Sequence, residues 1–124
     1  MMKIKVEANC SDAPERIFLK DLNLAFAEGD IEYIADVVTD DITWTIVGDK
    51  SVHGKAAFIE ALEQMKQYKT REIFIKKVIT HDKEGSTNGE MIMHDGKRFA
   101  YCDVYEFHGG SEIKSIVSYV IELA

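Results

Sequence analysis

The chain has 124 residues, 46% of them hydrophobic and 30% charged, so we expect one soluble globular domain over residues 1–124. A formal net charge of −7 argues against binding to nucleic acid, which requires a basic surface. Charges interrupt the long apolar stretches, and the first ten residues lack the apolar core of a secretory signal, so neither a membrane span nor export is expected. The two cysteines and four histidines are scattered, which favours a cytoplasmic protein without a metal site.

Two helices are predicted in the first third of the chain. Residues 1–10 precede them as a flexible lead or an edge strand. The first helix is expected to be capped by Asp12 and to end at Gly29, because short polar caps and a terminal glycine are typical of helix ends. Asp30 is expected to cap a second, shorter helix.

The rest of the chain is predicted to contain a third helix and a series of strands. Residues 39–48 are typical of a turn followed by a strand, and residues 52–68 contain the pattern of the third helix. Turn residues separate four further strand-like runs, which are residues 71–82, 86–95, 97–108 and 111–123. Helices followed by an antiparallel meander indicate an α+β fold.

The turns predict how the last three strands pair. If Asp95-Gly96 and Gly109-Gly110 are two-residue turns, Asp103 faces Asn88 on one side and Ile116 on the other. Alternation of side chains then gives one face that mixes aromatic and polar groups, as ligand pockets do. Its members are Asn88, Glu90, Ile92, Phe99, Tyr101, Asp103, Tyr105, Lys114, Ile116, Ser118 and Val120.

The opposite face of the predicted sheet is almost purely apolar. It collects Met91, Met93, Ala100, Cys102, Val104, Ile113, Val117, Tyr119 and Ile121. Three helices can cover only part of a sheet that is apolar on both sides. We therefore expect a homodimer that forms through the outer face of the sheet.

Asp103 is the main candidate for chemistry, because a carboxylate is unusual in an aromatic strand. In the predicted register Glu90 is its diagonal neighbour at roughly 7 Å, and repulsion between the two would raise one pKa. Asn88 and Tyr101 are placed to hydrogen-bond either carboxylate. Lys114 is also diagonal to Asp103, and an ordinary ion pair between them is the alternative interpretation.

Four stretches resemble the nuclear transport factor 2-like superfamily, in its SnoaL-like and ketosteroid-isomerase-like branch. They read LAFAEGDIEYIADVVTDDITWTIVG, VHGKAAFIEAL, YCDVYEF and IKSIVSYV, and the likeness covers residues 12–121. The resemblance implies an α+β conical barrel, in which a curved, mixed and mostly antiparallel sheet wraps around three N-terminal helices and leaves a pocket. Dimers through the sheet are common in this superfamily.

The resemblance carries over to single residues only in part. The tyrosine, base and acid of the steroid-isomerase pattern fall on Leu22, Ile46 and Asp103. The epoxide-hydrolase pattern falls on Asn88, Glu90 and Ser118. Both patterns are therefore incomplete. Polyketide cyclases of this branch rely on one inward aspartate, a role that Asp103 can fill.

Together these observations predict a pocket for a small apolar organic molecule. The catalytic candidates are Asp103 and Glu90, in an isomerase, cyclase or lyase that needs no cofactor. The alternative is a ligand-binding or dimerisation module of the same fold without chemistry. Trp44 shares a strand face with Ile46, so it joins the expected ligand contacts, which are Leu22, Trp44, Ile46, Asn88, Ile92, Phe99, Tyr101, Ile116, Ser118 and Val120.

Overall fold

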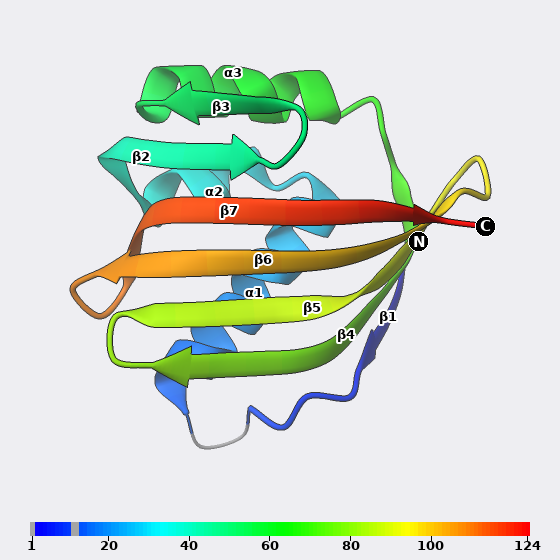
Figure 1. Cartoon of the computed structure of the whole chain (residues 1–124), viewed down its shortest axis with the longest axis horizontal. Coiled ribbons are helices and arrows are strands. Elements are labelled where there is room, and N and C mark those ends of the chain that lie inside the picture. Colours follow the sequence, from blue (N-terminus) through cyan, green and yellow to red (C-terminus); the bar gives the residue numbers. More distant parts are fainter. Residues whose placement is uncertain (1, 11–12) are drawn as a thin grey trace.

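A computed structural model describes residues 2–10 and 13–124 (Figure 1). Asp12, the expected cap of the first helix, lies outside the described residues. The elements in chain order are β1 (Lys3–Val6), α1 (Pro14–Glu28), α2 (Ile31–Asp36), β2 (Val38–Ile46), β3 (Lys50–His53), α3 (Lys55–Met65), β4 (Thr70–His81), β5 (Glu84–Met93), β6 (Arg98–His108) and β7 (Glu112–Leu123).

The ends of the first two helices follow from local chemistry. Pro14 occupies the first turn of α1, where its missing N–H leaves no hydrogen bond unmade. Gly29 ends α1 with a left-handed φ of 73°, as predicted. Asp30 caps α2 by accepting a hydrogen bond from the main-chain N–H of Tyr33 at 3.2 Å, which confirms that prediction too.

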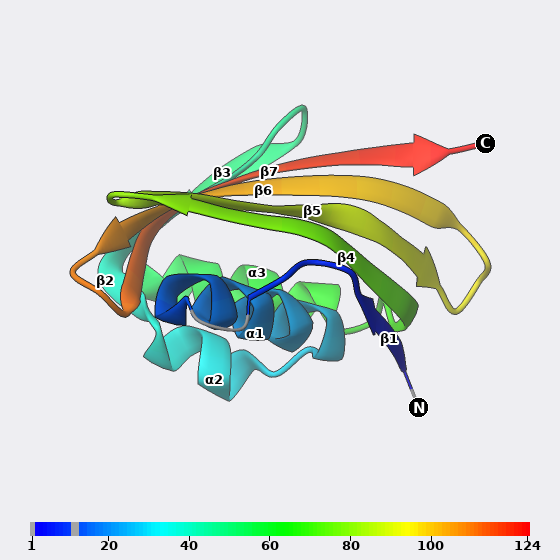
Figure 2. The ribbon, with the colours of Figure 1, turned by 90° about the horizontal axis from the view of Figure 1, so that it is seen from below.

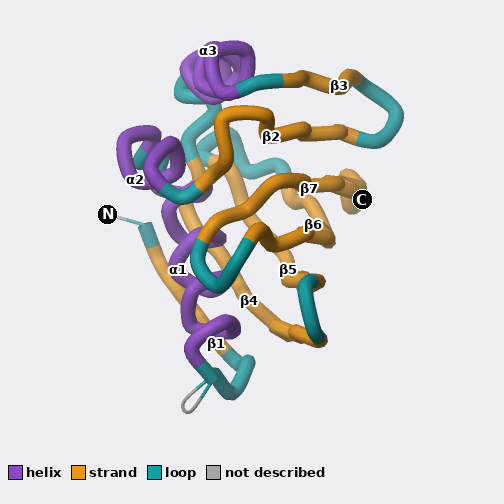
Figure 3. Tube along the Cα trace, turned by 90° about the vertical axis from the view of Figure 1, so that its left-hand side faces the viewer, coloured by secondary structure: helices purple, strands orange, loops and turns teal. Residues whose placement is uncertain are grey.

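The strands form one curved sheet in the order β1-β4-β5-β6-β7-β2-β3. Most neighbours are antiparallel, whereas β1 pairs with β4 and β2 pairs with β7 in parallel. Figure 2 shows the three helices on the concave side of the sheet and a bare outer side. The predicted α+β conical fold is confirmed, and residues 3–6 form an edge strand. The sheet does not close into a barrel, because β1 and β3 remain separate edges (Figure 3).

The first predicted turn is longer than expected, and this shifts β5 by one residue. The main-chain N–H of Met93 donates to the carbonyl of Lys97 at 2.9 Å, so the loop contains three residues and Gly96 adopts a φ of 89°. Asp103 therefore pairs with Thr87 instead of Asn88. Because side chains alternate, a one-residue shift turns every β5 side chain to the other face.

The second turn is also longer, but a bulge restores the predicted face for the residues of β7 that follow Lys114. Ile113 precedes the bulge and is fully buried opposite Phe107, so its expected place on the outer face is wrong. His108 pairs with Glu112, so this loop too has three residues, and an extra residue at Lys114 adds a second shift. Two shifts of one residue preserve the alternation of faces. Ser118 and Val120 therefore lie on the concave face with Asp103, as predicted, although Asp103 pairs with Ser118 rather than with Ile116.

Candidate functional site

A cavity of about 680 Å³ lies between the helices and the concave face of the sheet. Its volume falls within the usual range for small-molecule sites. Apolar side chains form most of the wall, and Trp44 packs there against Phe26 and Phe58 with ring centroids 5.7 and 5.4 Å apart. The polar side chains of the lining on α1, β6 and β7 are Asn23, Glu28, Tyr101, Asp103, Tyr105 and Ser118. Lys66, Lys69, Thr70 and His94 add polar groups elsewhere in the wall.

Asp103 lies at the centre of a polar row that crosses neighbouring strands. Its direct partners are the buried Thr87 on β5 and the buried Ser118 on β7. From β2, Trp44 donates its indole N–H to Oγ of Ser118 at 3.0 Å. Because the indole occupies that oxygen as an acceptor, the Ser118 hydroxyl hydrogen is free to point at the Asp103 carboxylate.

The environment of Asp103 favours its protonated form. Burial raises the pKa of Asp103 to about 6, and hydrogen bonds from the Ser118 and Tyr105 side chains oppose this increase only in part. Tyr105 is fully enclosed, and its hydroxyl lies 3.2 Å from Oγ1 of Thr87. Among the described residues, no cation contributes to the shift of this pKa. A carboxyl group with a pKa near 6 can both accept and release a proton near neutral pH.

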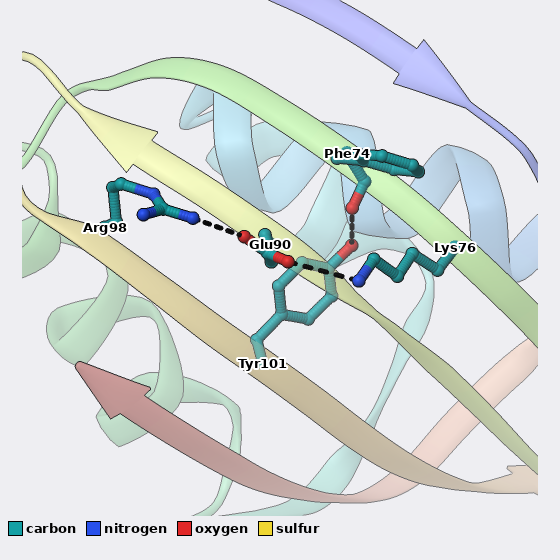
Figure 4. A network of polar contacts seen from close by, with 5 residues as sticks. All are labelled: Phe74, Lys76, Glu90, Arg98 and Tyr101. Carbon is teal, nitrogen blue, oxygen red and sulfur yellow. Dashed lines mark hydrogen bonds and ion pairs between the residues drawn. The ribbon is translucent and has the colours of Figure 1, made fainter. Parts of the chain in front are cut away.

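A second polar contact lies beside Asp103. Tyr101 extends from β6 across to α1, where its hydroxyl donates to Oδ1 of Asn23 at 2.7 Å. The carbonyl oxygen of Phe74 is 3.4 Å from the same hydroxyl (Figure 4). Burial, followed by the nearby negative charge of Asp103, raises the pKa of Tyr101, so this phenol stays neutral.

Glu90 is not part of this site, which corrects the predicted carboxylate pair. The shifted register turns it to the outer face, where it accepts from Lys76 Nζ at 3.1 Å and from Arg98 Nη2 at 3.2 Å (Figure 4). Hydrogen bonds from Lys76 and Arg98 lower the pKa of Glu90. It therefore remains an ordinary surface carboxylate.

The alternative interpretation, an ion pair between Asp103 and Lys114, does not hold either. The bulge turns Lys114 outward, and its Nζ lies 3.8 Å from Oε2 of Glu106. Without this pair, the main structural explanation for a partly buried carboxylate at Asp103 is removed. Asp103 instead faces a cavity.

The structure brings together seven of the predicted site residues. Trp44, Ile46, Tyr101, Asp103, Ile116, Ser118 and Val120 all line the cavity. Five others do not. Asn88, Glu90 and Ile92 belong to the outer face because of the register shift, Leu22 is completely buried, and Phe99 lies outside the cavity.

The sequence interpretation missed three kinds of cavity residue. Met91 and Met93 were assigned to the outer face and in fact line the cavity. Tyr105 shared the predicted face with Asp103 but was not among the ligand contacts. Asn23 was overlooked, although a signal was present, because it falls at helical spacing within the apolar stripe of Leu19, Leu22 and Phe26.

Two further properties concern the described residues as a whole. Within residues 2–10 and 13–124, no cluster of three or more His, Cys, Asp or Glu side chains is arranged to hold a metal ion. In the same part of the chain, no helix has both the length and the apolar character needed to cross a membrane.

Asp103 is expected to make the wild-type protein less stable above pH 6 than below it. Its pKa is about 6 in the folded protein and 3.8 in the unfolded reference, so the folded state binds the proton more tightly. Stability therefore falls as pH rises from about 4 to about 6 and is constant above that range. Asp103→Asn should raise the free energy of unfolding at pH 7.5 by about 2–3 kcal/mol.

Urea denaturation of both proteins at pH 4 and pH 7.5 measures this difference. The gain should be large at pH 7.5 and small at pH 4, where both side chains are uncharged. A variant that is less stable than the wild type at pH 7.5 would contradict the prediction.

Comparison with known proteins agrees with the observed architecture. A family model described as a SnoaL-like domain matches residues 19–116. An NTF2-like protein of unknown function from Cytophaga hutchinsonii is 27% identical, with a TM-score of 0.68 over 86% of this chain and 99% of that one. Among curated proteins, none matches the chain.

Two structures with enzyme names share the fold at lower identity. A putative ketosteroid isomerase from Kribbella flavida has a TM-score of 0.76 at 11% identity, over 90% of this chain and 80% of that one. An LEH-like epoxide hydrolase from M. tuberculosis has a TM-score of 0.72 at 18% identity, over 87% and 83%. At these identities the likeness concerns the fold alone.

Proposed function

The chain belongs to the SnoaL-like domain family, and on that premise we propose that its cavity binds a small apolar organic molecule on which Asp103 transfers a proton without a cofactor. The observation that carries this proposal is a partly buried carboxyl group that lines a mostly apolar cavity, with no cation of the described residues contributing to its pKa. Such a group costs stability, so its retention points to a use in chemistry.

The residues around Asp103 suit a base that acts on a carbon acid. The Asp103 carboxylate takes a proton from carbon next to a carbonyl group, the C–H electron pair becomes the enolate, and the protonated Asp103 returns the proton to the same or another carbon. Ser118 and Tyr105 donate to the carboxylate and so keep it oriented between the two steps. Return of the proton to another carbon gives an isomerisation of the ligand. In a cyclisation the enolate carbon instead attacks a second carbonyl carbon of the same ligand, a C–C bond forms as the C=O π pair moves to oxygen, and the protonated Asp103 returns the proton to that oxygen.

A hydrogen-exchange screen tests the proposal before any natural substrate is known. The wild-type protein is incubated in D₂O with a panel of cyclic ketones and enones, and loss of the α-proton signal is followed by NMR. We expect exchange above the buffer rate for those ketones that also bind. If ketones bind and none exchanges faster than in buffer, the catalytic part of the proposal is wrong and a binding protein without chemistry remains.

We also propose that the outer face of the sheet forms a homodimer. The outer patch, defined as Ile79, Val104, Tyr119 and Ile121, exposes between 38% and 65% of each residue. Ala100, Cys102 and Val117 lie between its members on the paired strands β6 and β7. None of the helices of the described residues covers this side (Figure 2). Ser86 on β5 separates Ile79 from the other members of the patch. An exposed apolar patch of this kind on β6 and β7 is typical of an interface.

Ile121→Lys is expected to convert the dimer into a monomer. Ile121 is the most exposed member of the outer patch. A lysine there would place two charges at a two-fold interface, and their desolvation opposes association. Light scattering coupled to size exclusion at micromolar concentration measures the mass. Ile4→Lys, on the edge strand β1, is the matched control and should leave the dimer intact. A wild-type protein that is monomeric under these conditions would rule out the interface.

A further inference from the structure

Asn23 occupies a position in α1 where an apolar residue is expected. It is 4% exposed and follows Leu19 and Leu22 on the face of the helix that packs against the sheet. Asparagine is a poor residue for a helix interior, and burial of its amide carries an additional cost unless the polar atoms are paired. Its presence therefore calls for an explanation in terms of what the amide contacts.

The oxygen of the Asn23 amide accepts a hydrogen bond from Tyr101. A phenol has one hydrogen to donate, and the 2.7 Å contact with Oδ1 of Asn23 is much shorter than the 3.4 Å contact with the Phe74 carbonyl. The hydrogen therefore lies on the Asn23 side. This contact fixes the amide with its oxygen towards Tyr101, so Tyr101 is a positioning residue.

The NH2 group of the Asn23 amide remains available to a ligand. Within the described chain, the side chain of Asn23 makes one hydrogen bond, which its Oδ1 accepts from Tyr101. Its Nδ2 is not a solvent-inaccessible atom that lacks a hydrogen-bond partner. Asn23 lines the cavity, so its two N–H donors are available there. Tyr101 and Asp103 are two residues apart on one strand face, which separates their positions by roughly 7 Å.

We propose that Asn23 binds the carbonyl oxygen of the ligand and so directs the neighbouring C–H group to Asp103. The expected ligand is a largely apolar ketone or enone, since the cavity offers one pair of N–H donors here and a mostly apolar wall. This inference rests on the proposed function, because it names the substrate class of the same cavity.

A fluorescent ketone can test the contact without any reaction. The probe is 6-propionyl-2-(dimethylamino)naphthalene, whose emission shifts to longer wavelength when its carbonyl accepts a hydrogen bond. It is titrated into the wild type, Asn23→Leu and Tyr101→Phe. Asn23→Leu should weaken binding about tenfold, the loss expected for one hydrogen bond, and should shift the emission to shorter wavelength.

Tyr101→Phe separates the two roles of Asn23. Both substitutions remove the bond between Tyr101 and Asn23, so equal effects on the probe would mean that Asn23 serves only as a partner for Tyr101, and the inference would be overturned. A wild-type protein that does not bind the probe would overturn it as well. We expect Tyr101→Phe to keep most of the emission shift. Asn23→Ala provides the same comparison if Asn23→Leu does not fold.

The same titration distinguishes this inference from the proposed function. Asp103→Asn should leave the emission shift unchanged, because the carbonyl contact involves Asn23 rather than the carboxyl group. If the wild type shows the shift but no ketone exchanges hydrogen in D₂O, the proton-transfer proposal fails and the carbonyl-binding role of Asn23 is supported.

Discussion

Asp103→Asn is expected to slow exchange of ketone α-protons by about 100- to 10,000-fold, the usual contribution of a positioned acid or base. The amide has nearly the same shape as the carboxyl group but cannot accept the proton. Binding of the ketone should change little, since the cavity wall is unaltered. The measurement is the exchange rate by NMR at saturating ketone, together with the dissociation constant.

Glu90→Gln is the matched control for this experiment. It makes the same chemical change on the neighbouring strand, but Glu90 faces outward to Lys76 and Arg98. Its exchange rate should equal that of the wild type. Equal loss in Asp103→Asn and Glu90→Gln would point to a general effect of charge or stability and would contradict a direct role for Asp103.

The pH profile adds a second signature of Asp103. A base must be ionised to accept a proton, and the pKa of Asp103 is about 6. Exchange should therefore rise with pH up to about 6 and then level off. The same ionisation lowers stability over the same range, so activity and stability change in opposite directions through one group. A profile governed by another pKa would assign the proton transfer elsewhere.

The fold could be predicted because its signals are local. Helix caps such as Asp30, the terminal glycine at Gly29 and the alternating strands each depend on a few neighbouring residues. Strand register is less accessible, because it depends on whether a turn has two or three residues. The turns around Gly96 and Gly109 both have three, and nothing in their composition excludes the shorter form.

Residues of the candidate site were assigned to the correct face of the sheet where two errors in the predicted strand register compensated each other. The bulge at Lys114 restored the face of β7, so Ser118 was assigned correctly, whereas β5 had no bulge against β6 and Glu90 was assigned to the wrong face. Residues on the helices depend on long-range packing. Nothing near Asn23 in the sequence indicates that Tyr101, 78 positions away, provides its hydrogen bond.

Gly89→Ala is expected to reduce the free energy of unfolding by about 3 kcal/mol or more, because it places an atom where the backbone leaves no space. Gly89 lies opposite Tyr101 and beside the bulge in β4. A Cβ atom there would overlap the Phe74 carbonyl oxygen and would lie 3.0 Å from the Tyr101 hydroxyl. A backbone atom cannot rotate away as a side chain can, so β4 and β5 must separate locally.

Thermal melting and urea denaturation at pH 7.5 measure this effect, and a loss of this size corresponds to a decrease in Tm of roughly 10 °C for a domain of this length. Gly110→Ala is the control, since a Cβ at Gly110 meets no atom within 4 Å. That variant should melt with the wild type. If Gly89→Ala also melts with the wild type, the backbone of β4 at Phe74 does not approach Gly89 as closely as the structure shows.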